Sequence, residues 1–133
     1  MSFHNIAYTA TASLAHLDDY ASKLQKAMEA VNEEMVYLHV LTPCPTGWRN
    51  ATEDAIEVSR AAVETNYSPL WEAEYGTFRM THIEPSPMPI SEFTKFMGRF
   101  AHLSEKEIGA LQEYVNKCYN QIYGLSEKAK PVY

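Results

Sequence analysis

An apolar run that ends in a cysteine between two prolines constrains the fold of this chain more than any other stretch. Residues 35–41 contain no Gly, Pro or Asp, which predicts a strand with both faces largely covered, as in a parallel sheet. Pro43 and Pro45 lack the N–H that a strand ladder needs, so pairing should stop before them. Cys44 is therefore expected on a stiff loop just past the carboxyl end of a strand, at the edge where open α/β sheets bind ligands.

Cys44 can be interpreted in two ways. Free cysteine is among the most often buried residue types, and many single cysteines simply fill space in a core. The position of Cys44 on a loop rich in Pro and Gly favours a functional thiol instead. His39 lies nearby in the sequence, but no third residue orients the two as nucleophile and base, so a hydrogen-bonded His39 beneath a helix is the simpler interpretation. Cys118 lies on the apolar stripe of a predicted helix, and we interpret it as core.

The amino-terminal third predicts a βαβ unit. Residues 6–12 are rich in small and β-branched side chains, as in a tightly covered internal strand. Residues 17–31 repeat apolar side chains at helical spacing, with Asp18 and Asp19 in the first turn, where the helix dipole favours acidic residues. The strands 6–12 and 35–41 should be parallel and joined by a right-handed crossover. An internal strand needs neighbours on both sides, and because this chain offers few, we expect part of the sheet to lie outside this sequence.

A helix and a hairpin follow the cysteine. Thr52 can cap a helix that runs to about residue 65. The segments 70–75 and 77–83 flank Gly76, which predicts a β-hairpin with a tight turn at that glycine. The pattern predicts the α/β fold class, with a βαβ portion followed by a hairpin and carboxyl-terminal helices.

The carboxyl-terminal region is predicted to be extended and then helical. Three prolines within 85–89 predict an extended segment that faces solvent or lies on a partner. Ser91 can cap a short helix over 92–98. Ser104 and Glu107 form a capping box for a longer helix, whose apolar stripe consists of Ile108, Leu111, Val115, Cys118 and Ile122.

The length of 133 residues and the 46% of hydrophobic residues suit one small domain or a piece of a larger one. We divide the chain into residues 1–84, the last part of an α/β domain, and residues 85–133, a Pro-rich segment with a helical extension. The polar tail from Gly124 onward is expected to fray.

Charge and composition exclude several classes of protein. The net charge is -6, and no basic cluster with interleaved aromatics is present, so nucleic acid is not expected as a partner. No window approaches the roughly 18 apolar residues of a membrane span, and no secretory signal is recognisable. Two cysteines do not make a disulfide framework. We therefore expect a cytoplasmic protein that binds neither nucleic acid nor a membrane.

Five short segments of the chain have distinctive sequences, namely residues 8–13, 41–48, 61–65, 69–72 and 96–103. In this order they resemble the thiamine-diphosphate-binding beta subunit of pyruvate:ferredoxin oxidoreductase and the related 2-oxoacid:ferredoxin oxidoreductases. The Pro-Thr-Gly-Trp sequence at 45–48 is more similar to the pyruvate and branched-chain members than to the 2-oxoglutarate members. The resemblance covers only the last part of such a subunit and implies that residues 1–84 are part of a doubly wound thiamine-diphosphate-binding domain.

The resemblance also implies where the cofactors would lie. In that family an upstream part carries the Gly-Asp-Gly motif for thiamine diphosphate and magnesium, together with three of the four cysteines that hold a 4Fe–4S cluster. None of these motifs is present here, so no catalytic and no thiamine-binding residue is expected on this chain. The fourth cluster ligand matches Cys44, which would therefore bind iron. Since Pro45 has no N–H, the hydrogen-bond donors to the Cys44 sulfur should be Thr46, Gly47 or a neighbouring chain.

The function implied is oxidative decarboxylation of a 2-oxoacid, most simply pyruvate, to acyl-coenzyme A, with electrons passing through 4Fe–4S clusters to ferredoxin. This chain would supply one cluster ligand and contacts to the other subunits, and would be inactive alone. The alternative is a non-enzymatic module for subunit assembly, in which Cys44 binds no cluster. A weaker alternative is an enzyme that uses Cys44 as its nucleophile.

Overall fold

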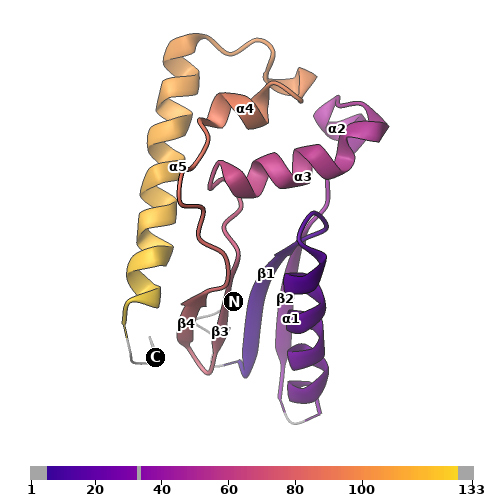
Figure 1. Ribbon diagram of the computed structural model, residues 1–133, viewed down its shortest axis with the longest axis vertical. Coiled ribbons are helices and arrows are strands. Elements are labelled where there is room, and N and C mark those ends of the chain that lie inside the picture. The colour runs from indigo at the N-terminus through magenta and orange to yellow at the C-terminus, as the bar shows by residue number, and fades with distance from the viewer. Residues whose placement is uncertain (1–5, 33, 129–133) are drawn as a thin grey trace.

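The computed structural model describes residues 6–32 and 34–128 (Figure 1). Its strands are β1 (Tyr8–Ser13), β2 (Val36–Leu41), β3 (Trp71–Glu74) and β4 (Thr77–Met80). Its helices are α1 (Leu17–Ala30), α2 (Pro45–Trp48), α3 (Ala55–Glu64), α4 (Ile90–Thr94) and α5 (Glu105–Ser126). Two short 3-10 turns lie at Thr52–Asp54 and Gly98–Phe100.

The strands of the described residues form a mixed sheet in the order β2-β1-β3-β4. β1 and β2 are parallel, with Tyr8 opposite Val36, and α1 connects them, so the predicted βαβ unit is confirmed. β3 is antiparallel to β1, and β4 is antiparallel to β3. β1 is therefore internal, as its small and β-branched residues predict. The α/β class with a hairpin and carboxyl-terminal helices is confirmed, and the arrangement is consistent with a thiamine-diphosphate-binding-type domain.

The predicted hairpin is confirmed at its turn. Tyr75 has φ 46° and Gly76 has φ 76°, and two central residues with positive φ are the mark of a type I′ turn. This turn matches the twist of the flanking strands, so β3 and β4 pair in register from Glu74 opposite Thr77 to Trp71 opposite Met80.

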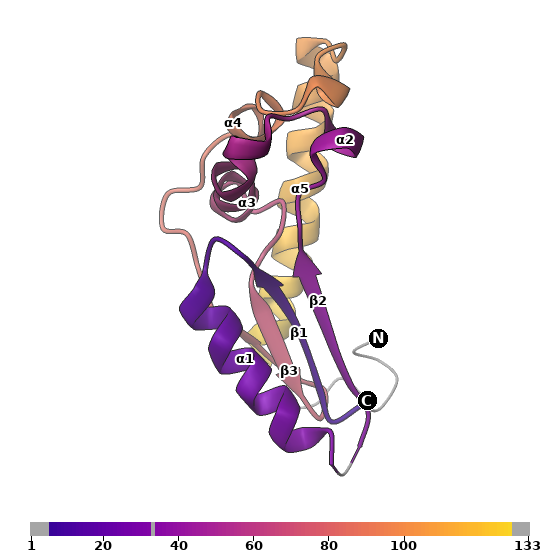
Figure 2. The same cartoon turned by 90° about the vertical axis from the view of Figure 1, so that its right-hand side faces the viewer.

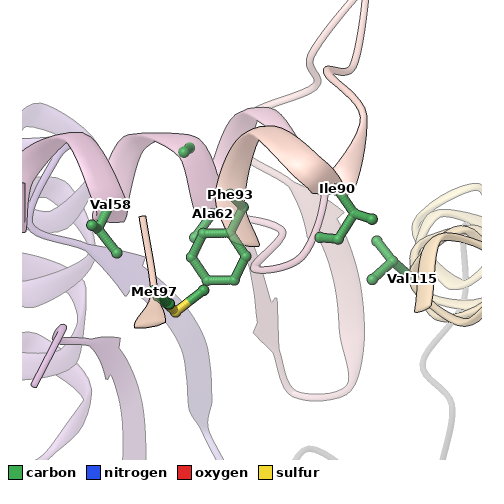
Figure 3. Close-up of a cluster of buried hydrophobic side chains, with 7 residues drawn as sticks. Val58, Ala62, Ile90, Phe93, Met97 and Val115 are labelled. Carbon is green, nitrogen blue, oxygen red and sulfur yellow. The ribbon is translucent and has the colours of Figure 1, made fainter. Parts of the chain in front are cut away.

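Two separate hydrophobic clusters hold the elements together. Under α1, the first consists of Tyr8, Ala10 and Ala27, with Val36 and Leu38 packed against it. The second lies where α3, α4 and α5 meet, and Figure 3 shows Ile90 of α4 and Val115 of α5 pointing toward one another. The second cluster joins residues before and after position 84. The division of the chain at this position stays a prediction.

Strand β2 differs from the prediction because it forms an edge of the sheet. Its residues alternate between half-buried and exposed, and Tyr37 and His39 are exposed. α1 covers the face that carries Val36 and Leu38. The expectation that both faces of β2 are covered is therefore wrong for this chain, and so is the placement of His39 beneath a helix.

Two predicted helix caps are also wrong. Thr52 starts a 3-10 turn, and α3 begins only at Ala55, without a side-chain cap. Ser91 lies inside α4, which begins at Ile90. The Ile90 N–H donates to the side chain of Gln112 in α5 at 2.7 Å. An acceptor from a distant helix therefore replaces the expected local cap.

The longest helix, α5, begins as predicted and ends later than predicted. Ser104 accepts a hydrogen bond from the Glu107 N–H, and the Glu107 carboxylate accepts one from the Ser104 N–H, so the capping box is confirmed. The helix continues through Gly124 to Ser126, so a frayed tail from Gly124 is wrong for the described part. None of the described helices is long and apolar enough to cross a membrane.

Candidate functional site

Three strands end at the same edge of the sheet. β1 and β2 are parallel, and β4 runs with β1 because each is antiparallel to β3. Three candidate side chains therefore follow strand ends at this edge, namely Cys44 after β2, His16 after β1 and His82 after β4. This is the edge at which open α/β sheets bind ligands, and Figure 1 shows α2 and α3 lying beyond it.

Cys44 is the residue that precedes the short helix α2. Its backbone is extended, Pro45 occupies the first helical position, and its Sγ accepts a hydrogen bond from the Gly47 N–H at 3.4 Å. Pro43 is buried, whereas Cys44 is exposed. The stiff segment predicted from the prolines is thus a single helical turn, and of the three predicted sources of a donor to the sulfur, Gly47 is the one that donates. The thiol is held on fixed backbone and faces solvent.

Residues from the carboxyl-terminal half contact the α2 turn and the residue after it. The ring of Trp48 meets that of Phe93 edge-on, with centroids 6.0 Å apart. The Gly98 N–H donates to the Arg49 carbonyl at 3.1 Å, and Arg49 itself has φ 56°. The position of Cys44 therefore depends on the segment 93–98, which is distant in the sequence.

Replacing Gly98 with alanine is expected to displace this turn. The added Cβ would lie 3.1 Å from both the Cβ and the carbonyl oxygen of Arg49, and backbone cannot yield as a flexible side chain can. We expect the free energy of unfolding to fall by about 1–3 kcal/mol, measured by urea denaturation.

Gly109→Ala is the matched control for this substitution. A Cβ at Gly109, inside α5, meets nothing within 4 Å, so this variant should gain up to about 1 kcal/mol from helix propensity. Equal stability of Gly98→Ala and the parent chain would contradict the packing argument.

The two histidines at the other end of this edge form a small polar cluster. The rings of His16 and His82 lie 5.0 Å apart, and His82 Nε2 is 3.7 Å from the Glu84 carboxylate. Burial, and then the neighbouring His82, lowers the pKa of His16, so its neutral form is favoured. Nδ1 of His16 and Nε2 of His82 are buried and make no hydrogen bond with the described residues.

A cavity of about 390 Å³ lies between β2, α2 and α5. It is lined by His39, Leu41, Trp48, Asn66, Tyr67, Ser68, Pro69, Tyr114, Val115, Cys118 and Ile122. Cys118 is only partly buried at this wall, so its prediction as a core residue is only partly correct. No hydrogen bond joins His39 to Cys44 among the described residues, which leaves the nucleophile–base interpretation without support.

Cys44 could serve as one ligand of a metal, but the described residues around it do not form a complete metal site. In the described ranges, 6–32 and 34–128, no group of three or more His, Cys, Asp or Glu side chains could hold a metal ion. An exposed thiol with a backbone N–H directed at its sulfur nevertheless fits the environment of a cluster-binding thiolate. The other ligands of such a cluster would have to come from outside these residues.

Known proteins resemble this chain over most of its length. It is 40% identical over 126 residues to the ketoisovalerate oxidoreductase subunit VorB of Pyrococcus horikoshii, covering 93% of this chain and 40% of VorB. It is 39% identical over 119 residues to the pyruvate synthase subunit PorB of Methanocaldococcus jannaschii, covering 89% of this chain and 39% of PorB. It is 38% identical over 127 residues to the beta subunit of the NADH-dependent phenylglyoxylate dehydrogenase of Aromatoleum evansii, covering 95% of this chain and 28% of that subunit.

These matches confirm the resemblance found in the sequence. The chain spans about two fifths of the length of the VorB and PorB relatives. No family model matches the chain.

Proposed function

We propose that this chain, a homologue of the PorB and VorB subunits over most of its length, forms part of the beta subunit of a 2-oxoacid:ferredoxin oxidoreductase. The observation that carries the proposal is the 40% identity to VorB across 93% of the chain. The exposed Cys44 on its rigid turn supports it, because the resemblance drawn from the sequence implies that this residue is the fourth ligand of the cluster. The relatives are named for ketoisovalerate, pyruvate and phenylglyoxylate, so the substrate class is a 2-oxoacid, with pyruvate as our first candidate.

The proposed role of this chain is structural and electronic. Thiamine diphosphate, magnesium and a 4Fe–4S cluster would supply decarboxylation and electron transfer to ferredoxin, with coenzyme A accepting the acyl group. Cys44 would provide one cluster thiolate, and the Gly47 N–H would stabilise the negative charge on its sulfur. Residues 1–84 would complete the thiamine-diphosphate-binding domain, residues 85–133 would contact other subunits, and the complex would be cytoplasmic.

The test uses a two-piece subunit, defined as this chain co-expressed with the part of P. horikoshii VorB that lies outside the matched segment. A 4Fe–4S cluster needs four ligands, so this chain alone should bind no stoichiometric cluster after anaerobic incubation with iron and sulfide. The two-piece subunit should bind one cluster, which Cys44→Ser should remove. Iron and sulfide content and visible absorption measure the result.

Cys118→Ser is the matched control, because Cys118 is the second free cysteine and lies on α5. It should keep the cluster and cost only packing, about 1–2 kcal/mol. Full iron content in the Cys44→Ser two-piece subunit would refute the ligand assignment and favour the assembly module.

A further inference from the structure

Helix α1 and Val31, the residue just after its end, carry a row of exposed apolar side chains. Leu17, Leu24, Met28 and Val31, here called the outer stripe, are 65%, 41%, 64% and 55% exposed. Their spacing places them on one narrow side of the helix. The sheet side of α1 instead buries Lys23 and Ala27. An apolar row of this size on one side of a helix indicates a contact surface.

The outer stripe lies on the side of α1 nearest the free edge of β2. Lys26, on one side of the buried row, reaches across to Glu72 of β3 at 2.7 Å. The outer stripe is on the opposite side of that row, which leaves it facing past β2. Figure 1 shows α1 beside β2 at this end of the sheet, and Figure 2 looks onto the same side.

The outer edge of β2 is open for pairing. The Ala7 N–H donates to the Met35 carbonyl at 3.2 Å, so alternation directs the backbone groups of Val36, Leu38 and Val40 away from β1. No strand of the described residues pairs with that edge. β2 also contains no Lys and no Pro, the residues with which natural proteins protect edge strands.

We propose that the outer stripe and the β2 edge form one docking surface for a strand-and-helix unit from the rest of the subunit. Its strand would pair in parallel with β2, and its helix would lie beside α1 on the outer stripe. A strand alone would leave the stripe exposed, and a helix alone would leave the edge unpaired. A parallel sheet with its helix layer satisfies both at once.

The choice of occupant rests on the proposed function and on length. The matched segment makes up only 40% of VorB, so the greater part of such a subunit is available to provide the unit. A second copy of this chain is the competing occupant, and the test separates the two.

The test is retention of this chain by the tagged complementing part of VorB in the two-piece subunit. Leu24→Glu should reduce retention at least tenfold, since it places a charge within the stripe. Ile56→Glu is the matched control, because Ile56 is an exposed aliphatic residue of α3 with 43% exposure, close to the 41% of Leu24, and it should leave retention unchanged. In the retained chain, hydroxyl-radical labelling of Met28 and amide exchange of Val36, Leu38 and Val40 should slow at least tenfold relative to the chain alone.

Absence of retention, equal retention of Leu24→Glu and Ile56→Glu, or undiminished labelling of Met28 would each overturn the proposal. Protection of Met28 in the chain alone that grows with its concentration would assign the surface to a second copy. Iron content distinguishes this result from a failure of the proposed function. Retention through the stripe without Cys44-dependent iron contradicts only the cluster, and Cys44-dependent iron with no effect of Leu24→Glu contradicts only the docking surface.

Discussion

Replacing the buried Lys23 with methionine is expected to lower the free energy of unfolding by about 3 kcal/mol, as for removal of one partner from a buried ion pair. Lys23 is 1% exposed, and its Nζ donates to the Thr11 carbonyl at 2.8 Å, the Asp19 carboxylate at 2.6 Å and the Thr81 hydroxyl at 2.7 Å. These bonds join α1 to β1 and to the chain just after β4. Methionine has a similar length and would fill the space, but all three acceptors would lose their donor.

Urea denaturation of the two chains at one concentration measures this effect. Lys117→Met is the matched control, since Lys117 is an exposed lysine in the middle of α5, and its effect should stay within about 0.5 kcal/mol. A loss below about 1 kcal/mol for Lys23→Met would show that the buried ammonium group costs nearly as much to bury as its bonds return.

The second large effect is a loss of folding stability at low pH, which we expect from protonation of Glu72. This carboxylate is 2% exposed and accepts hydrogen bonds from Tyr8, Lys26 and Arg79. Burial alone would raise the pKa of Glu72, but the bonds from Lys26, Arg79 and Tyr8 outweigh it and lower the pKa to about 2. Burial raises the pKa of Tyr8, which therefore stays a neutral donor.

A folded-state pKa below the ordinary value of 4.5 stabilises the folded state at higher pH. The contribution of Glu72 should therefore be complete above about pH 5 and should disappear as pH falls toward 2. The difference in pKa corresponds to about 3 kcal/mol at most, and since Arg79 is largely exposed, solvent screening reduces it to about 2 kcal/mol.

Unfolding free energies of Glu72→Gln and of the parent chain at pH 7 and pH 3 test this prediction. Glu72→Gln should lose most at pH 7 and should show a flatter pH dependence. Glu113→Gln, at an exposed site on α5, should follow the parent chain. A parallel pH dependence of Glu72→Gln and the parent would show that this carboxylate does not govern acid stability.

The parts of the fold that could be predicted from the sequence are those determined by neighbouring residues. The capping box joins Ser104 to Glu107, and the hairpin turn depends on Gly76 and the residue before it. The rigid, exposed turn at Cys44 was predictable for the same reason, since the two adjacent prolines restrict it. Each of these features involves no more than a few consecutive residues.

The parts that could not be predicted depend on residues far apart in the sequence. The amino end of α4 is satisfied by Gln112, 22 residues further along the chain, so the local signal at Ser91 was misleading. The contact of Gly98 with Arg49 has no local signature beyond the glycine itself. Helical periodicity located the apolar residues of α1, but it could not show that the sheet would cover Lys23 and Ala27 and leave Met28 exposed.

The central position of β1 also affects the order in which the fold can form during synthesis. The bond from the Tyr8 hydroxyl to the Glu72 carboxylate spans 64 residues, and β3 pairs directly with β1. At the usual speed of translation, β1 leaves the ribosome roughly 3–13 s before β3. During that time β1 and β2 can pair, but the other side of β1 stays open to wrong partners. We therefore expect nascent chains in which β3 has not yet left the ribosome to bind chaperones, and those in which β4 has also left it to be released.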